Sequence, residues 1–305
     1  MRFLGLRVVL ALGVFTASAF GPAAWAARAA LGVASDDRAA GSVDRPASKA
    51  NLPGGVETKA YHWGFQKSRD GRPPSIAREG FQALIERYGA LFYDEKGGKV
   101  LYLTFDNGYE NGQTARILDV LKEKNVPATF FVTGHYLRSA PELVRRMVAE
   151  GHIVGNHSWS HPDMSALSPA EIRREIERVN AAIAELTPQR TTVFFRPPRG
   201  VFSERLLRTV REMGMETIFW SVAYKDWERD VVRGADVAYR QVMGQLHPGA
   251  VILLHSVSKD NADALGRIID DARAQGYVFQ SLEDWRLRER SLLTPEGAST
   301  GDDDT

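Results

Sequence analysis

Short apolar runs rich in β-prone residues alternate with amphipathic helical stretches along most of the chain. The apolar runs predict seven strands, at residues 100–105, 128–133, 152–155, 192–195, 216–221, 250–254 and 277–279. Helical periodicity predicts helices between them, at residues 114–124, 141–150, 169–186, 203–213, 235–246 and 261–275. Repeated β-α units imply parallel strands joined by right-handed crossovers. The predicted fold class is therefore α/β, with either an open doubly wound sheet or a barrel.

The first 26 residues have the pattern of an export signal. Arg2 and Arg7 give a positive start, residues 8–20 are almost wholly apolar, and residues 24–26 form an Ala-Trp-Ala cleavage site. We expect cleavage after this site and hence an exported protein, in the cell wall, the periplasm or the extracellular space. An uncleaved membrane anchor is the alternative, although the apolar run is short for a helix that spans a bilayer.

The rest of the chain divides into four regions. Residues 27–52 are rich in small and polar residues without periodicity, which predicts a disordered linker. Residues 53–99 precede the repeated units, and we expect them to form an N-terminal extension packed on those units. Residues 100–288 contain the repeated β-α units and form the main domain. Residues 289–305 end in Gly-Asp-Asp-Asp-Thr and predict a solvated tail.

Composition narrows the choice of partners and chemistry. The 305 residues are 44% hydrophobic and 25% charged, as in an ordinary globular chain, and the net charge of +1 gives no broad positive field for nucleic acid. Signal cleavage removes two of 39 basic residues against 38 acidic ones, which brings the net charge to about −1. The absence of cysteine excludes disulfides and thiolate chemistry. We expect the mature chain to be a monomer without a transmembrane segment.

Ionisable side chains follow five of the predicted strands. Asp106 follows the first strand, His157 the third, Arg196 the fourth and His255 the sixth, and Asp226 lies just beyond the fifth. Because the carboxyl ends of parallel strands meet at one rim, we expect these side chains to converge there. One such residue alone is more often a helix cap or a buried hydrogen-bond partner, whereas five together indicate a catalytic site.

His157 and His161 have the spacing that sets two imidazoles on one side of a helical turn. Such a pair is typical of sites for Zn²⁺ or a similar divalent ion. Since the chain has no cysteine, oxygen ligands must complete the coordination, and residues 104–111 offer candidate carboxylate and amide oxygens, among them that of Asn107. Two surface histidines near a turn are the alternative, because two ligands are a weak signal unless a third group converges on them.

Five segments resemble, in order, the motifs of the polysaccharide deacetylases, also called the NodB-homology group or carbohydrate esterase family 4. They are Thr-Phe-Asp-Asn-Gly at 104–108, His-Ser-Trp-Ser-His at 157–161, Arg-Pro-Pro-Arg-Gly at 196–200, Asp-Trp at 226–227 and Leu-Leu-His at 253–255. The resemblance spans about residues 100 to 285. It implies a distorted (β/α) barrel with about seven parallel strands, and it makes residues 100–288 the catalytic domain.

A narrower resemblance points to one subgroup of this family. Residues 62–65, 105–112, 196–203 and 247–249 look like the delta-lactam-biosynthetic de-N-acetylases, which act on N-acetylmuramic acid in spore cortex peptidoglycan. The implied function is hydrolytic N-deacetylation of N-acetylmuramic acid in a peptidoglycan glycan strand. Deacetylation of N-acetylglucosamine or chitin oligomers is one alternative, and glycan binding without catalysis is another.

The resemblance also implies a role for each motif residue in amide hydrolysis, which requires an activated water and a protonated leaving nitrogen. Asp106 corresponds to the general base, and Arg196 pairs with it and keeps it ionised. His157 and His161 correspond to ligands of a divalent metal, with zinc expected. His255 corresponds to the general acid, and Asp226 orients it and favours its charged form.

Three further positions are expected to contact substrate. Trp227 and Leu253 correspond to the wall that receives the acetyl methyl group, and Tyr109 lies in the first motif beside the predicted base. Ordinary core packing is the alternative for Trp227 and Leu253.

Two positions depart from the common family pattern. Most members have a second aspartate, a metal ligand, where this chain has Asn107, and a neutral amide oxygen predicts a weaker metal site. Arg199 stands where many members have an aromatic residue. Its planar guanidinium suits a bidentate pair with a carboxylate, and we therefore expect it to select the free lactyl carboxylate of a muramic residue. A surface arginine after two prolines is the alternative.

Overall fold

The computed structural model describes residues 58–64 and 66–293. The predicted signal peptide, the predicted linker and residues 294–305 of the predicted tail lie outside the described residues, as does Phe65. None of the described helices is both long and apolar enough to cross a membrane.

Seven strands form one parallel sheet, as the pattern of apolar runs predicted. The sheet order is β7-β5-β4-β3-β2-β8, and β9 pairs with the start of β2. The strands are β2 (Val100–Asn107), β3 (Ala128–Val132), β4 (Ile153–Asn156), β5 (Phe194–Phe195), β7 (Glu216–Thr217), β8 (Ala250–His255) and β9 (Val278–Phe279). Every pairing in this sheet is parallel.

The sheet curls until its two ends meet. A parallel bridge pairs Val222, just after β7, with Ile252 in β8. Beside it, the Ser221 N–H donates to the Val251 carbonyl and the Leu253 N–H donates to the Val222 carbonyl. These contacts close a distorted barrel, so the fold class expected from the sequence is confirmed.

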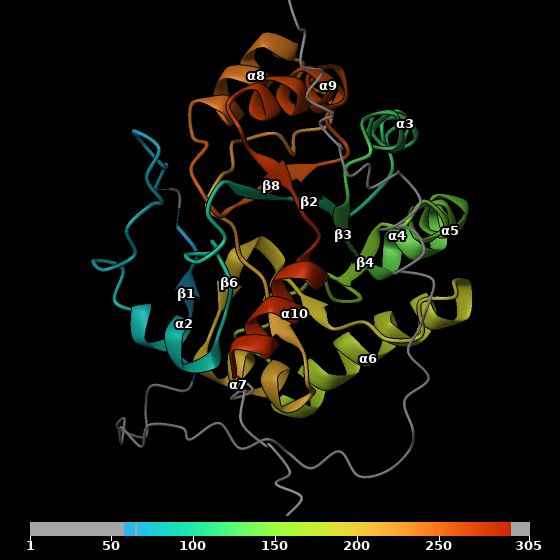
Figure 1. The fold of residues 1–305 in the computed structure, drawn as a ribbon. Coiled ribbons are helices and arrows are strands. Elements are labelled where there is room, and N and C mark those ends of the chain that lie inside the picture. Colours follow the sequence, from blue (N-terminus) through green and yellow to red (C-terminus); the bar gives the residue numbers. More distant parts are fainter. Residues whose placement is uncertain (1–57, 65, 294–305) are drawn as a thin grey trace, which may run out of the picture.

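Helices surround the barrel (Figure 1). The predicted helices are present as α3 (Thr114–Lys124), α5 (Pro141–Ala149), α6 (Pro169–Leu186), α7 (Glu204–Glu212), α8 (Ala235–Met243) and α9 (Lys259–Ala274). Serine side chains cap the amino ends of three of them. Ser168 forms a reciprocal capping box with Glu171 at α6, and Ser203 and Ser258 accept backbone N–H groups of α7 and α9. Each such cap stabilises its helix by about 1 kcal/mol.

Several short elements were not predicted. They are α2 (Gln82–Tyr88), α4 (Gly134–Ser139), the 3-10 turn η1 (Pro198–Gly200), α10 (Leu282–Leu293) and an antiparallel pair of β1 (Tyr61–His62) with β6 (Val201–Phe202). Helix α10 continues past residue 288 into the segment expected to be tail. Leu282 and Trp285 are buried in the core and anchor it there.

Residues 91–94 of the N-terminal extension lie between the carboxyl end of β7 and the amino end of β8. The Leu91 N–H donates to the Thr217 carbonyl at 2.9 Å, and the Asp94 N–H donates to the Gly249 carbonyl at 2.8 Å. Gly249 has φ +75°, and a Cβ there would lie 1.9 Å from the Asp94 carbonyl oxygen. Only glycine allows this close approach of the extension to the barrel.

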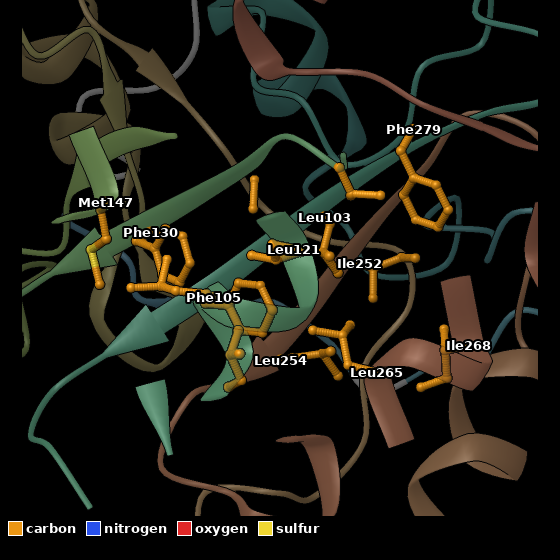
Figure 2. Close-up of a cluster of buried hydrophobic side chains, with 14 of the residues drawn as sticks. Leu103, Phe105, Leu121, Phe130, Met147, Ile252, Leu254, Leu265, Ile268 and Phe279 are labelled. Carbon is orange, nitrogen blue, oxygen red and sulfur yellow. The ribbon is translucent and has the colours of Figure 1, made fainter. Parts of the chain in front are cut away.

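Alternation along β2 sets which of its side chains enter the barrel. Leu103 and Phe105 pack outward against the helices, in one core with Leu121 of α3 and Leu265 of α9 (Figure 2). Burial of each such side chain contributes about 1.5–3 kcal/mol. Because strand side chains alternate, Asp106 points to the opposite face, into the barrel.

Candidate active site

A cavity of about 940 Å³ opens at the carboxyl ends of the barrel strands. Asp106 at the end of β2, His157 just after β4 and His255 at the end of β8 line its wall. The other predicted site residues that line it are His161, Arg199, Tyr109, Trp227 and Leu253. Arg196 and Asp226 are buried and bind Asp106 and His255, respectively. The five side chains that follow the strands thus lie together at one rim of the barrel.

The buried Arg196 side chain binds the Asp106 carboxylate and fixes its position. Arg196 is fully buried, and its Nη1 lies 2.8 Å from Asp106 Oδ1. The same guanidinium donates to Thr104 Oγ1 at 2.9 Å and to the Ile218 carbonyl at 3.0 Å, which fixes its plane. Burial alone would raise the pKa of Asp106, but the charge of Arg196, with smaller contributions from His157 and His255, brings that pKa below its ordinary value. Asp106 is therefore an ionised carboxylate at neutral pH.

His157 and His161 place two neutral imidazoles beside this carboxylate. His157 Nδ1 lies 2.9 Å from the Arg196 carbonyl oxygen, and its Nε2 lies 3.4 Å from Asp106 Oδ2. Nδ1 therefore carries the proton, and the Nε2 lone pair faces Asp106. The two imidazole rings are 4.9 Å apart. Burial lowers the pKa of His157, and burial together with His157 lowers the pKa of His161 to about 4.

The loop that carries these imidazoles corrects one expectation from the sequence. Residues 157–161 form no helical turn, and Ser158 and His161 have positive φ values of 65° and 57°. Asn156 Oδ1 accepts the Ser158 N–H at 2.9 Å, and Ser158 Oγ accepts the His161 N–H at 3.0 Å. Side-chain acceptors stabilise this left-handed loop in place of helical bonds, and the loop still brings the two rings together.

His255 and Asp226 form a second pair with the opposite charge preference. His255 Nδ1 lies 2.7 Å from Asp226 Oδ1, while Asp226 Oδ2 accepts the His255 N–H at 2.8 Å and the Asn261 amide at 2.6 Å. Burial would lower the pKa of His255, but the charge and hydrogen bond of Asp226 raise it above its ordinary value. The protonated form of His255 is therefore favoured at the pocket wall.

Comparison with known proteins identifies the family. The sequence profile described as polysaccharide deacetylase matches residues 93–218. The peptidoglycan-N-acetylmuramic acid deacetylase PdaA of Bacillus subtilis (strain 168) is 45% identical over 238 residues, which cover 78% of this chain and 90% of that protein. The protein belongs to the polysaccharide deacetylase family.

A solved structure of the same relative and one further relative extend the match of this polysaccharide deacetylase. The solved structure of B. subtilis PdaA, a family 4 carbohydrate esterase, aligns with a TM-score of 0.74 at 44% identity and covers 77% of this chain and 100% of that one. A chitooligosaccharide deacetylase of Bradyrhizobium sp. (strain ANU 289) is 43% identical over 206 residues, which cover 66% of this chain and 90% of that protein. Because the named relatives are deacetylases and the solved structure that aligns is a family 4 carbohydrate esterase, the protein is an enzyme of this class.

Asn107 differs from its expected place in the deacetylase site. Its Nδ2 donates to Ser256 Oγ at 2.5 Å, and its side chain is absent from the pocket wall. Since Asp106 points into the barrel, the next residue on the strand points to the other face. Within the described residues, no group of three His, Asp or Glu side chains is arranged to hold a metal ion. His157 and His161 suit a metal as neutral nitrogen donors, whereas Asn107 does not turn toward them.

Arg199 stands at the lip of the deacetylase pocket. It lies in η1 with φ 58°, and its side chain is 55% exposed. Its nearest carboxylate, Asp163, is 4.0 Å away and 45% exposed. An exposed pair at that distance contributes little, about 0–1 kcal/mol, so the guanidinium is available to a ligand.

The predicted wall residues are divided between the lip and the core. Tyr109 and Trp227 are among the more exposed aromatic side chains, and the Trp227 ring lies 5.8 Å from that of His255. Leu253 lines the pocket and is also buried in a core cluster, so contact with substrate and core packing apply to it together.

The sequence did not single out the residues that support the catalytic ones. Asn261 binds Asp226, Thr104 binds Arg196, and Glu175 accepts hydrogen bonds from the backbone and hydroxyl of Ser160 in the histidine loop. Thr104 precedes Asp106 by two residues on the same strand face, and this alternation was an available signal. Glu175 and Asn261 reach the site only through packing of their helices.

Proposed function

We propose that this deacetylase removes the acetyl group from N-acetylmuramic acid residues in peptidoglycan. The observation that carries the proposal is that an ionised carboxylate, Asp106, and a proton-donating imidazole, His255, line one pocket that has a free guanidinium, Arg199, at its lip. Amide hydrolysis requires a general base and a general acid, and a guanidinium can bind the carboxylate of an anionic sugar. The name of the B. subtilis relative supports the same substrate.

The residues divide the proton transfers of amide hydrolysis between them. Asp106 accepts a proton from water, whose oxygen adds to the acetyl carbon. Arg196 keeps Asp106 ionised and in position. His255 then donates its proton to the sugar nitrogen as the carbon–nitrogen bond breaks, and acetate and the free amine leave. Asp226 holds the His255 ring and favours its charged form before this step.

We further propose that His157 and His161 hold a divalent metal, with zinc expected. Members of the family generally depend on a metal. A bound metal ion supplies Lewis acidity, which polarises the acetyl carbonyl and makes water easier to deprotonate. Both imidazoles are neutral, as nitrogen ligands must be, and His157 has its Nε2 lone pair free of a proton. With Asn107 bound to Ser256, we expect weak metal binding.

Arg199 is proposed to select muramic acid over glucosamine. Muramic acid has a lactyl ether with a carboxylate, which N-acetylglucosamine lacks. A guanidinium forms a bidentate pair with such a group only when the carboxylate is free, that is, after the stem peptide has been removed. Arg199→Ala should therefore lose the preference for muramic residues. Hydrolysis of both sugars with the wild-type preference would contradict this role.

Two other functions are separated from the proposal by simple assays. The identity to a chitooligosaccharide deacetylase favours glucosamine polymers as a second candidate substrate. That function predicts acetate release from chitin oligomers at least as fast as from peptidoglycan. A glycan-binding protein without catalysis would release no acetate from either, although it would have no need of an opposed base and acid.

The decisive experiment is mass spectrometry of peptidoglycan digested with the purified enzyme. The peptidoglycan is used with and without prior amidase treatment, which frees the lactyl carboxylates. We expect loss of one acetyl group from muramic residues after amidase treatment, and no loss with the Asp106→Asn variant. Loss of acetyl groups from glucosamine residues alone would contradict the proposal. Further loss of one water from the product would show that the freed amine closes a lactam on the lactyl carboxylate.

We also propose that the enzyme is exported, with residues 1–26 as its signal peptide. The apolar run and cleavage site in the sequence support this proposal, as does a peptidoglycan substrate. Amino-terminal sequencing of the protein recovered from the culture medium or cell envelope should begin at Ala27. An intact amino terminus in the membrane fraction would indicate an uncleaved anchor.

A further inference from the structure

Trp159, in the loop of residues 157–161, lines the pocket and lies close to two arginine side chains. The Arg138 guanidinium lies 4.9 Å from the centre of the Trp159 ring, and the Arg178 guanidinium lies 4.2 Å from it. Trp159 also packs on Gly134 at the start of α4, where a Cβ would come within 2.3 Å of the ring. The tryptophan is therefore fixed in place, and it and Arg138 both line the cavity.

Positive charge on this side of the pocket lacks a matching carboxylate. Arg138 is exposed on α4, and within residues 58–64 and 66–293 no carboxylate forms a salt bridge with it. Asp163 lies at the opposite lip, 4.0 Å from Arg199, and two other carboxylates of the site are bound by groups other than Arg138. Asp106 is bound by Arg196, and Glu175 by Ser160. Although the whole chain is close to neutral, an anion in this part of the pocket meets a local excess of positive charge.

The cavity is also larger than one sugar needs. At about 940 Å³ it lies at the upper end of the range of roughly 300–1,000 Å³ that holds drug-sized ligands. Arg199 comes from the turn after β5, and Arg138 comes from the helix after β3. The two guanidinium groups therefore enter the cavity from different strand ends.

We infer that Arg138, supported on Trp159, binds a second carboxylate, carried by a neighbouring muramic residue of the same glycan strand. This inference rests on the proposed function, in which Arg199 binds the lactyl group of the residue being deacetylated. Muramic residues alternate with glucosamine in peptidoglycan, so an anionic group recurs along the strand. The Trp159 ring lies 4.9 Å from the Arg138 guanidinium and supports it, which leaves the N–H groups of the guanidinium for a carboxylate of the ligand. Two anchors on one strand set the direction in which the enzyme binds it.

The second carboxylate has two possible sources, which the substrates of the test separate. It is either the free lactyl group of the neighbouring muramic residue or a carboxylate of a stem peptide on that residue. The substrates are a disaccharide with one muramic residue and three tetrasaccharides with two. In the tetrasaccharides the second muramic residue has a free lactyl group, a stem peptide, or a neutral amide in place of the carboxylate.

The variant for the test is Arg138→Met, which keeps an apolar side chain of similar reach over Trp159 but removes the charge. Arg145→Met is the matched control, because Arg145 is exposed on the neighbouring helix α5 and is absent from the pocket wall. We expect Arg138→Met to raise KM for a tetrasaccharide with a second carboxylate by about tenfold more than for the disaccharide, with kcat little changed. The tetrasaccharide whose KM rises more, with a free lactyl group or with a stem peptide, identifies the source of the carboxylate.

Other outcomes would overturn the inference. A rise in KM for the disaccharide and for the neutral amide as large as that for the tetrasaccharides with a second carboxylate would mean that Arg138 only supports Trp159. No change on any substrate would mean that Arg138 makes no contact. Wild-type acetate release from the disaccharide is measured in the same assay. If the wild type releases no acetate, the proposed function is wrong. If the wild type is active and Arg138→Met has the wild-type KM on every substrate, only the second carboxylate site is contradicted.

Discussion

His157 faces Asp106 across 3.4 Å, and His255 binds Asp226 at 2.7 Å, so two histidine–aspartate pairs line the same pocket. Their charge states are opposite. The pKa of His157 is lowered, mainly by burial, whereas the pKa of His255 is raised because Asp226 more than offsets the effect of burial. The first imidazole is therefore a neutral lone-pair donor, and the second is an acid.

The difference comes from what else each carboxylate binds. Asp106 has the buried Arg196 guanidinium at 2.8 Å, so much of its negative charge is already balanced before His157 is considered. Asp226 binds two neutral donors, the His255 N–H and the Asn261 amide, and its charge acts on the His255 ring. The two imidazoles thus differ in charge preference because His255 is hydrogen-bonded to its carboxylate at 2.7 Å, whereas His157 lies 3.4 Å from a carboxylate that Arg196 already binds.

Removal of the Asp106 charge should have the largest effect on catalysis. Asp106→Asn keeps a hydrogen-bond acceptor for Arg196 but cannot take a proton from water. We expect kcat to fall by about 10²–10⁴-fold. Acetate release gives the rate, and thermal unfolding shows whether the variant is folded. A folded variant with more than a tenth of wild-type kcat would exclude Asp106 as the base.

Metal removal should separate the two pairs from each other. Chelation should lower activity by about 10–100-fold, and graded zinc addition should restore it, because the neutral imidazoles of His157 and His161 can ligate metal, whereas the protonated form of His255 cannot. Metal content after dialysis gives a second measurement. It should fall in His161→Ala and remain in His255→Ala. Full activity of the chelated wild type would remove the metal role of the two imidazoles.

The Asp226 carboxylate should set the alkaline limit of activity. Since Asp226 raises the pKa of His255, the acid stays protonated to higher pH than an ordinary imidazole would. Asp226→Asn removes the charge, so the pKa of His255 falls and the alkaline limb of the kcat profile moves to lower pH. Above the new limb, kcat should drop about tenfold for each pH unit, as the protonated fraction does.

Two results with Asp226→Asn would contradict this prediction. An alkaline limb at the wild-type pH in Asp226→Asn would mean that another group provides the proton. A general loss of rate without a shift would mean that Asp226 only positions the ring.

A smaller effect is expected at Asn107. Its Oδ1 is buried without a hydrogen-bond partner in the described structure, and its Nδ2 binds Ser256. Asn107→Asp would bury a charge between β2 and β8, and we expect it to lower the free energy of unfolding by about 1–3 kcal/mol without tighter zinc binding. Urea unfolding and zinc titration measure both effects. Tighter zinc binding at unchanged stability would place residue 107 in a metal site.

Much of the fold could be predicted because its strands are buried on both faces. Such strands give continuous apolar runs, as at residues 128–133, and these stand out from the helical periodicity around them. The missed elements depend on contacts instead. β1 pairs with β6 across about 140 residues, and α10 is anchored where Leu282 and Trp285 reach the core.

The candidate site shows the same division. Strand ends located Asp106, His157 and His255, since parallel strands bring their carboxyl ends together. The loop at residues 157–161 could not be inferred, because its left-handed residues are stabilised by side-chain acceptors and by Glu175 of α6. Asn107 was predictable from strand alternation alone, but the family resemblance outweighed that signal.

The sequence by itself determined the order of strands and helices and the residues that stand at the strand ends. These depend on local periodicity, which is written in neighbouring positions. Only the tertiary structure decided the charge preference of each residue, with the pKa lowered at Asp106 and His157 and raised at His255. A pKa depends on burial and on charges that approach through space, and Arg196 reaches Asp106 from 90 residues away.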